Sequence, residues 1–486
     1  MRIAPGLLLG TLLLGPVAAT ATERLPAVLH VHSTLSTGQL SLEDLAALAE
    51  QGGIGAIFLS ENYLLHVEYG LPPFRALTRV SYNERSVLAS GIDGYLRRVA
   101  EVRRRFPRVL VLPGVEVMPH YRWTGSPFRF DMTVSGTQKN VLVFGVSDPA
   151  VLRALPAIGN PHTARYTWQS VVDVSPAVLI VPGAMLLAVK RRRRERLGRA
   201  VVVVERRAWL TGTVLCAVGM IALVRAWPFT SEAYPPYGDL GLTAHQDLID
   251  EVQRAGGVTV WSFPEAVDSG ARKVGLVNVS WETTPYADDL LRTFRYTAFG
   301  AVYENATRFE RPGDGWDRLL RQYAAGERRI PAWAVGESGF HEFSAGKRFG
   351  TLQTVFLVDE RSEAAVLDAF RHGRMYALHR APKEALALGA FAVRAGAATA
   401  TSGDTLMAPP GTPLEVDVAI DASDGGPQEV RVALVRDGAV VEAWSGTTPF
   451  RGRHLATFDG RSTFFRVDAR GVAPHRLLTN PIFVRP

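Results

Sequence analysis

The chain has 486 residues, of which 47% are hydrophobic and 21% charged, an ordinary balance for a globular protein of two or three domains. Its single cysteine, Cys216, excludes a disulfide framework, a cysteine-based metal site and a cysteine nucleophile. The mean hydropathy of +0.06 is slightly positive, which directs attention to membrane segments.

Residues 1–21 have the layout of a secretory signal. Arg2 precedes an apolar run from Ile3 to Ala19, and small residues continue through Ala21. We expect cleavage after AATA at 18–21, or retention of the segment as an N-terminal anchor. In both cases the segment directs the residues that follow across the membrane.

The stretch 26–40, PAVLHVHSTLSTGQL, combines an apolar run with two histidines. Ala27–Val31 predicts a short buried strand, and the alternation of side chains along a strand sends His30 and His32 to one face. Two neutral imidazoles placed in this way can bind one metal ion. The alternative is that two histidines at a strand end only make hydrogen bonds.

The residues up to 150 predict alternating helices and strands, with Ser41 as the N-cap of the first helix and Asp44 in the capping-box position. Strand–helix–strand units build parallel sheets or barrels, and barrel enzymes keep their sites where the strands end. The predicted elements are a helix over 41–51, a strand over 54–59, a helix over 93–106, a strand over 109–112, a loop over 120–139 and a strand over 141–146.

Two apolar runs in the middle of the chain predict a hairpin of two transmembrane helices over 170–226. The runs Val174–Val189 and Ala208–Val224 have 16 and 17 residues. Both lie at the short end of what spans a bilayer, where about 20 residues are typical, and a buried core helix is the alternative for each.

The connection between the two runs decides the predicted topology. Residues 190–207 hold nine basic and two acidic residues, so their net charge of +7 equals that of the whole chain. A short basic connection between apolar spans is expected in the cytoplasm. We therefore expect a protein of the cytoplasmic (inner) membrane whose remaining parts face the periplasm or exterior. The bilayer is then the expected partner, anionic lipid heads are compatible with the basic loop, and a nucleic acid is not needed to explain the charge.

The α/β pattern resumes after the hairpin, and from about Phe391 an alternating β pattern replaces it, with a hairpin turn at Asp437-Gly438. We interpret 390–486 as a small antiparallel sandwich that serves as a structural cap or interaction module. The other predicted elements are helices over 244–255, 285–299, 315–325 and 361–371, and strands over 258–262, 276–281, 332–335, 415–420, 455–458 and 464–467.

Five motifs occur in order at the predicted strand ends: HVHSTLSTG from residue 30, SEN at 60–62, PGVEV at 113–117, WSFPE at 261–265 and GESGFH at 336–341. Together they resemble the PHP superfamily, named for polymerase and histidinol phosphatase, over 26–150 and 240–385. The resemblance implies a distorted (β/α)7 barrel, interrupted here by the membrane hairpin. It also implies two or three divalent metals, usually zinc, manganese or iron, which hydrolyse phosphate esters.

Carried over by position, the resemblance implies four metal ligands, namely His30, His32, Glu116 and His341. Glu61 keeps a carboxylate and is a fifth ligand or the general base. Four ligands imply one ion rather than three. Other positions depart from the family, because Thr37, Asn62, Asn140, Phe263 and Gly339 stand where it has ligands.

His120 and Glu337 lie a few residues from matched positions and are alternative ligands. We expect a membrane-tethered, extracytoplasmic hydrolase of the phosphoesterase type, with a partly degenerate metal site and a small phosphoester substrate. The alternative is a catalytically inactive PHP-fold pseudoenzyme that acts as an envelope scaffold or sensor. A third possibility is an interaction protein whose C-terminal β domain binds a partner.

Overall fold

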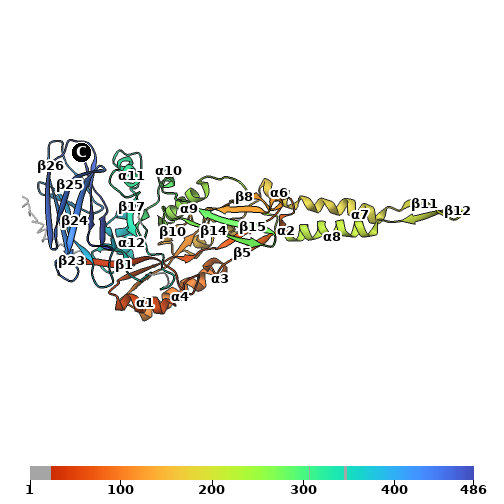
Figure 1. Cartoon of the computed structure of the whole chain (residues 1–486), viewed down its shortest axis with the longest axis horizontal. Coiled ribbons are helices and arrows are strands. Elements are labelled where there is room, and N and C mark those ends of the chain that lie inside the picture. The colour runs from red at the N-terminus through yellow and green to blue at the C-terminus, as the bar shows by residue number, and fades with distance from the viewer. Residues whose placement is uncertain (1–22, 306, 344–346) are drawn as a thin grey trace, which may run out of the picture.

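The computed structural model describes residues 23–305, 307–343 and 347–486 (Figure 1). The predicted signal or anchor at 1–21 lies outside the described residues. The molecule is elongated: β-strands of the C-terminal region form one end, an α/β region lies in the middle, and two helices with a β-ribbon form an arm at the other end (Figure 1).

Two sheets form the middle region. In the first, β1 (Glu23–Val31), β2 (Ala56–Leu59) and β6 (Leu110–Leu112) run parallel, and β18 (Leu352–Val358) lies antiparallel on the other side of β1. The second sheet has the order β17-β16-β13-β10-β7-β3. Its strands are β3 (Glu61–Asn62), β7 (Gly114–Val117), β10 (Val141–Phe144), β13 (Val258–Trp261), β16 (Ala298–Val302) and β17 (Trp333–Gly336).

The two sheets are joined at both sides. The chain passes from β2 to β3 across Ser60 and from β6 to β7 across Pro113. On the other side, the segment after β17 lies parallel to the end of β1, where Phe340 N donates to His30 O at 2.9 Å and His32 N donates to Phe340 O at 2.9 Å. The ends of β1, β3, β7 and β17 are thereby brought together.

Five predicted helices are present, and they cover the strands. Ser41 caps α1 as predicted, because its Oγ accepts from Asp44 N at 3.1 Å while its own N donates to Asp44 Oδ2 at 3.2 Å. A capping box of this kind satisfies amide groups that would otherwise lack a partner. The helices are α1 (Leu42–Gln51), α4 (Ile92–Arg105), α9 (Thr243–Arg254), α11 (Gly315–Ala324) and α12 (Glu363–His372).

The core of the middle region is aromatic and aliphatic. Phe58 of β2 packs against Phe144 of β10, Phe356 of β18 and Phe370 of α12, with ring centroids 5.0, 5.5 and 5.7 Å apart. All four rings are buried. This packing fixes the strands whose ends carry the candidate site.

The predicted helix over 285–299 is wrong. Only α10 (Asp289–Arg292) is helical, and residues 298–302 form β16, which is buried between β13 and β17. The helical turn ends at Arg292, because Thr293 has an extended backbone, and Arg295 then adopts a left-handed φ of 67°. Pairing with two strands distant in sequence then outweighs the local helical pattern.

The predicted loop over 120–139 is also wrong, because it contains β8 (Arg122–Ser126) and β9 (Asp131–Ser135). These strands form a separate four-stranded sheet with β15 (Val277–Thr283) and β14 (Asp268–Val274), so the strand predicted over 276–281 lies outside the central sheets. The described chain passes from β7 to β10 through β8, a 3-10 turn and β9 without an α-helix, and β10 pairs antiparallel with both β7 and β13. The parallel pairing that strand–helix–strand units build is therefore interrupted at this strand.

The arm contains both apolar runs. The helical segment Trp168–Ala188, which comprises α6 (Trp168–Val174), a 3-10 turn and α7 (Ile180–Ala188), has 21 residues and a mean hydropathy of 2.0, long and apolar enough to cross a membrane. It packs against α8 (Trp209–Arg225), which has 17 residues (Figure 1). A Cβ on Gly212 would lie 2.8 Å from Gly183 O, so glycine allows the two helices to approach closely.

The basic connection is a β-hairpin rather than a loop. β11 (Arg191–Leu197) pairs antiparallel with β12 (Ala200–Arg206) around Gly198, whose φ is 63°. The run of four valines in β12 favours an extended backbone, and Lys190 Nζ and Arg192 Nε lie 3.0 and 3.1 Å from the carboxylate of Glu205. The ribbon forms the tip of the arm (Figure 1).

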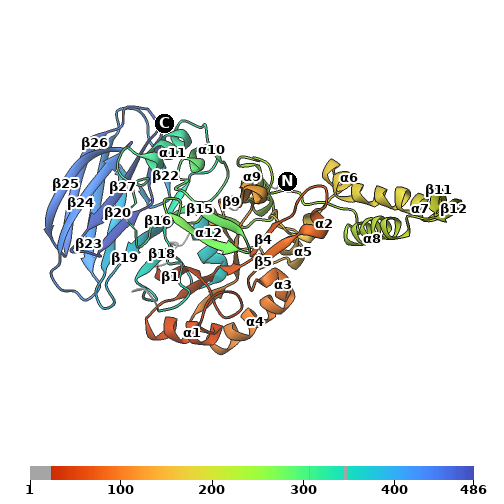
Figure 2. The ribbon, with the colours of Figure 1, turned by 45° about the vertical axis from the view of Figure 1, so that its right-hand side comes forward.

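The C-terminal region consists of two β-sheets with a common hydrophobic core, at the end opposite the arm (Figure 2). The turn predicted at Asp437-Gly438 is confirmed between β24 and β25. One sheet is continuous with β1, because β28 (Arg476–Thr479) pairs with β19 (Met375–His379), which pairs with β18. The other strands are β20 (Leu386–Ala395), β21 (Ala398–Thr401), β22 (Thr405–Met407), β23 (Pro413–Ala422), β24 (Glu429–Arg436), β25 (Ala439–Thr447), β26 (Phe450–Thr457), β27 (Thr463–Arg470) and β29 (Ile482–Arg485).

Candidate metal centre

Three of the predicted ligands, His30, His32 and Glu116, have ligand atoms within 4.8 Å of one another. His30 Nε2 lies 3.0 Å from His32 Nε2 and 3.4 Å from Glu116 Oε1, and His32 Nε2 lies 3.5 Å from Glu116 Oε2. Two ligands at about 2.0–2.1 Å from one tetrahedral ion are about 3.3 Å apart. The three side chains therefore have the spacing of neighbouring ligands of a single ion.

The end of β1 is irregular where it carries the two histidines. The register between β1 and β2 shifts between Leu29 and Val31, and His30 adopts a φ of 65°, a conformation that non-glycine residues seldom adopt. The rings of His30 and His32 nevertheless lie on the same side, with centroids 5.0 Å apart. The prediction that they share a face is confirmed, although a bulge rather than regular alternation brings them together.

The hydrogen bonds behind the two imidazoles determine which nitrogens carry protons. His30 Nδ1 lies 2.7 Å from Glu337 Oε1, a carboxylate that only accepts, so Nδ1 is the protonated nitrogen. Ser36 Oγ donates to Glu61, and it can therefore accept from His32 Nδ1 at 3.5 Å. Assigned in this way from the network, both Nε2 lone pairs point at each other and at Glu116. A proton or a cation between them can satisfy this group of acceptors, and histidine and carboxylate ligands suit a divalent metal ion.

Without an ion, the electrostatics of the cluster place the missing positive charge on His30. Burial lowers the pKa of His30, but the carboxylates of Glu116 and Glu337 outweigh it and raise the pKa above its ordinary value. Burial raises the pKa of Glu116, but His30 and His32 outweigh it and lower the pKa. Burial and the positive charge of His30 lower the pKa of His341 to about 4. In the absence of an ion, a proton on His30 supplies the positive charge that the cluster needs.

Glu337, an alternative ligand by sequence, lies behind His30. Its Oε1 also accepts from Ser262 Oγ at 2.6 Å, and its Oε2 accepts from Phe263 N at 3.1 Å. A Cβ on Gly300 would lie 1.9 Å from Glu337 Oε2, so glycine provides the room for this carboxylate. A carboxylate hydrogen-bonded to the far nitrogen of a metal-binding histidine fixes the ring and its tautomer.

Glu61, predicted as a fifth ligand or general base, is fully buried and bound to two serines. Its Oε1 accepts from Ser33 N at 3.0 Å and from Ser33 Oγ at 2.5 Å, and its Oε2 accepts from Ser36 Oγ. Burial raises the pKa of Glu61, although these hydrogen bonds oppose the effect. The structure places this carboxylate behind His32, to which it is linked through Ser36.

His341 lies against the cluster, but its ligand atoms are not among those that converge within the described residues. Its ring stacks on that of His32, with centroids 3.9 Å apart and planes inclined by 12°. Its Nδ1 lies 3.1 Å from Thr37 Oγ1, which accepts from Asn62 Nδ2 at 2.8 Å. Thr37 and Asn62, two positions at which the resemblance implies ligands, thus hold His341 in place.

Asn140 and Phe263, at two further positions where the resemblance implies ligands, also contact the cluster. Asn140 Nδ2 donates to Glu116 Oε1 at 2.8 Å, and its buried Oδ1 has no hydrogen-bond partner among the described residues. The ring of Phe263 stacks on His30 with centroids 5.1 Å apart. A Cβ on Gly339 would lie 2.7 Å from Phe263 Cζ, so the phenyl ring occupies the space that a side chain at 339 would need.

The remaining alternative ligand, His120, lies elsewhere, with its Nε2 3.3 Å from Pro235 O.

Sequence reasoning missed Ser33, Ser36 and Ser262, whose hydroxyl groups donate hydrogen bonds to the buried carboxylates of Glu61 and Glu337. The sequence partly indicated two of them, because Ser33 and Ser36 follow His32 closely in the first motif.

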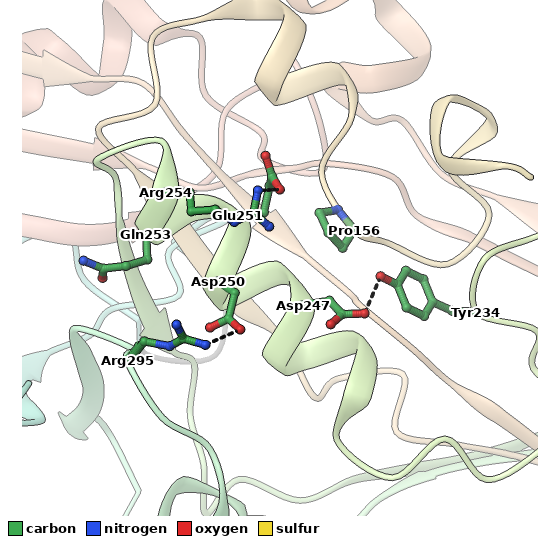
Figure 3. A pocket seen from close by; sticks show the side chains of 8 residues that line it. All are labelled: Pro156, Tyr234, Asp247, Asp250, Glu251, Gln253, Arg254 and Arg295. Carbon is green, nitrogen blue, oxygen red and sulfur yellow. Dashed lines mark hydrogen bonds and ion pairs between the residues drawn. The ribbon is translucent and has the colours of Figure 1, made fainter. Parts of the chain in front are cut away.

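A surface hollow of about 490 Å³ on α9 lies apart from these residues. Its polar side chains bind one another: Tyr234 Oη donates to Asp247 Oδ2 at 3.0 Å, and Arg295 Nη2 donates to Asp250 Oδ2 at 2.5 Å (Figure 3). These pairs leave it without the convergent acceptors of the His30 cluster.

No family model matches the chain, and no curated protein matches it. Among solved structures, a two-domain protein from Bacteroides vulgatus that contains a predicted PHP-like metal-dependent phosphoesterase is similar, with a TM-score of 0.36 and 11% identity over 92% of this chain and 90% of that one. An amidohydrolase from Chromobacterium violaceum, with bound sulfate and no metal, has a TM-score of 0.27 and 14% identity over 65% of this chain and 88% of that one. Similar structures thus include PHP-like proteins, at a distance that carries no argument about activity.

Proposed function

We propose that the chain is a membrane-tethered PHP-type hydrolase that binds one divalent ion through His30, His32 and Glu116 and cleaves a small phosphate ester outside the cytoplasm. The observation that carries the proposal is the convergence of two imidazole nitrogens and a carboxylate whose lone pairs face one another. Zinc, manganese and iron are the candidate ions, since histidine and carboxylate ligands suit them.

His30, His32 and Glu116 would hold the ion, and three protein ligands are the number found in catalytic rather than structural zinc sites. A divalent ion bound there supplies Lewis-acid stabilisation of charge on phosphoryl oxygens. Glu337 and Glu61 orient the two histidines in this proposal, the second acting through Ser36. Lys347 donates to Gly339 O at 2.9 Å, and its positive charge acts on His32 and His341, so it is placed to attract an anionic substrate.

The fold proposed to present this site is a distorted seven-stranded barrel made by β1, β2–β3, β6–β7, β10, β13, β16 and β17. Supporting it are the strands that pass from one sheet to the other and the hydrogen bonds of Phe340 with His30 and His32. In this arrangement the site lies at the strand ends, where barrel enzymes carry their chemistry.

The membrane placement rests on the arm. A helix of 21 residues at about 1.5 Å per residue is about 32 Å long, close to the about 30 Å of a bilayer core. Trp168 and Trp227 are 78% and 71% exposed at the end of the arm nearest the body, and Trp209 is 66% exposed near the basic ribbon. Exposed tryptophans at both ends of apolar helices are typical of membrane interfaces.

The second candidate function is a pseudoenzyme that retains the fold as a scaffold or sensor. Phe263 and Gly339 favour it, because the phenyl ring fills space beside His30 in which the family holds further ligands. An aromatic ring of this kind cannot ligate a metal ion.

Metal analysis and hydrolysis separate the two candidates. The full chain is purified in detergent, incubated with Zn²⁺ or Mn²⁺ and desalted, and bound metal and hydrolysis of p-nitrophenyl phosphate are measured for wild type, His32→Ala and the exposed control His162→Ala. About one equivalent of metal together with hydrolysis, both lost only in His32→Ala, supports the hydrolase. Metal without hydrolysis of any phosphoester tested supports the pseudoenzyme, and absence of metal contradicts the site.

Single-cysteine labelling tests the topology. In a Cys216→Ser background, Ser445→Cys should react with a membrane-impermeant maleimide in intact spheroplasts, whereas Arg199→Cys should react only after permeabilisation. The opposite pattern, or labelling of both positions in intact spheroplasts, would contradict the proposed orientation.

A further inference from the structure

A second hollow lies at the foot of the arm, apart from the metal centre. It has a volume of about 230 Å³ and is enclosed by α2 (Arg75–Thr78), α6, the end of α8 and the segment 226–237. α2 packs directly against α8. The hollow is therefore formed where the apolar helices meet the body of the protein.

The charges around this hollow balance. Its lining contains three guanidinium groups and three carboxylates, so a bound group with one charge of each sign would leave the balance unchanged. They are Arg75, Arg79, Arg225, Glu68, Asp173 and Glu232.

Arg75 offers donors to an anion. Its side chain is 17% exposed, and its guanidinium lies over the ring of Tyr237, 3.7 Å from the centroid, which fixes its position. Its Nη1 lies a long 3.8 Å from Asp173 Oδ1, and its buried Nε has no hydrogen-bond partner among the residues described. A buried donor without a partner is costly unless a ligand supplies an acceptor.

Glu232 offers an acceptor to a cation. Its Oε2 is buried and lacks a hydrogen-bond partner within the described part of the chain. Burial and the nearby charge of Glu68 raise the pKa of Glu232 to about 7. A group that both carries positive charge and donates hydrogen bonds would stabilise the ionised carboxylate. A primary ammonium does so, whereas a quaternary ammonium has no N–H to donate.

The position of the hollow indicates where such a ligand comes from. Trp227 lines it and is largely exposed, as is Trp168 at the start of α6. Tryptophans of this kind lie at the level of lipid headgroups. The opening is thus at the depth at which a membrane presents its phosphates and amines.

We propose that this hollow binds the headgroup of a zwitterionic phospholipid of the ethanolamine class, with its phosphate against Arg75 and Arg225 and its ammonium against Glu232. The proposal rests on the membrane placement of the arm described under the proposed function. The bound lipid would hold the helices to the body of the protein at the membrane surface.

Binding to the full chain in a non-phospholipid detergent tests this proposal. The probes are dihexanoyl-phosphatidylethanolamine, dihexanoyl-phosphatidylcholine, glycerophosphoethanolamine and inorganic phosphate, titrated by calorimetry. We expect the ethanolamine lipid to bind at least tenfold more tightly than the choline lipid. Glu232→Gln should abolish this preference, and Arg75→Gln and Arg225→Gln should each weaken both lipids. Glu251→Gln, on α9 and outside the lining of this hollow, should change neither.

Equal affinity for the two lipids, an undiminished preference in Glu232→Gln, or inorganic phosphate binding as tightly as the ethanolamine lipid would overturn the proposal. Glycerophosphoethanolamine carries the headgroup without acyl chains, so it measures the contribution of the headgroup alone. It should bind more weakly than the lipid, and its binding should depend on Glu232 in the same way. Membrane fractionation and metal content are measured on the same preparations. A chain that fractionates with membranes and binds metal through His32, yet shows no headgroup preference, refutes only this inference.

Discussion

The Nδ1 atom of His30 lies 2.7 Å from the Oε1 atom of Glu337, although the two residues are 307 positions apart in the chain. Both side chains are buried, and Glu337 is further bound by Ser262 and by the backbone of Phe263. This contact leaves the other nitrogen of His30 free to face His32 and Glu116. The orientation of His30, in the first of the five motifs, therefore depends on Glu337, in the last of them.

Glu337→Gln should weaken metal binding by about 10–100-fold, because the substituted amide no longer fixes the tautomer of His30 as a carboxylate does. The affinity for Zn²⁺ or Mn²⁺ is measured by competition with a chelator. Glu251→Gln, on the surface of α9, is the matched control. An affinity within twofold of wild type would show that Glu337 does not position His30.

Glu61→Gln and Ser36→Ala should weaken metal binding by similar factors, since both break the connection from Glu61 through Ser36 to His32. The double variant should be no weaker than the worse single variant, because residues in one network are not additive. If Glu61 is instead the general base, Glu61→Gln lowers kcat and removes the acidic limb of the pH profile while Ser36→Ala leaves both in place. Chelator competition and pH–rate profiles together distinguish these two roles of Glu61.

Gly339→Asp should destabilise the protein by about 1–3 kcal/mol more than the same substitution at a glycine that has a positive φ but no neighbour close to its Cβ. Gly339 has a φ of 55° and its Cβ would meet Phe263, whereas Gly53 has a φ of 66° and open space around its Cβ. Gly53→Asp is therefore the matched control. In thermal denaturation, the additional loss should disappear in the double variant Phe263→Ala/Gly339→Asp, and its persistence would contradict the steric coupling.

The stability of the protein should fall below about pH 6.5 in part because of His245. This residue is buried, its Nε2 lies 3.2 Å from Lys139 O, and its ring stacks on Trp261. Burial, and then the charge of Lys139, lower its pKa to about 3. The unfolded histidine binds a proton below about pH 6.5 and the folded one does not, so protonation favours unfolding as the pH falls, by about 2 kcal/mol at pH 5.

His245→Gln should therefore reduce the difference in thermal midpoint between pH 7 and pH 5, even though it costs stability at pH 7. His162→Gln, at an exposed position, is the control and should leave the pH dependence as it is in wild type. An unchanged difference in His245→Gln would mean that other groups dominate the acid response.

Asp317→Asn should destabilise the protein by about 3–5 kcal/mol, because it leaves the guanidinium of Arg466 buried without a counter-charge. The two side chains are fully buried and are joined by two hydrogen bonds of 2.7 Å that link α11 to β27 of the C-terminal region. The double variant Asp317→Leu/Arg466→Met should recover most of the loss in chemical denaturation. Asp421→Asn, which breaks the exposed pair with Arg451, should cost less than about 1 kcal/mol.

The sequence by itself determined the elements that local patterns encode. The cap of Ser41 on α1, the turn at Asp437-Gly438 and the apolar helices of the arm follow from residues within a few positions of one another. The grouping of His30, His32 and Glu116 was implied by the resemblance of the five motifs, which also implied His341 as a ligand, and these three residues do lie together.

Only the tertiary structure decided what surrounds these ligands. Glu61 binds two serines, Glu337 supports His30, and His341 stacks on His32, and none of these contacts follows from spacing along the chain. The same holds for the strand at 298–302 and for the antiparallel β10. The physical reason is that helix caps and turns are made by neighbours in sequence, whereas strand pairing and hydrogen bonding of buried carboxylates join residues that only the folded chain brings into contact.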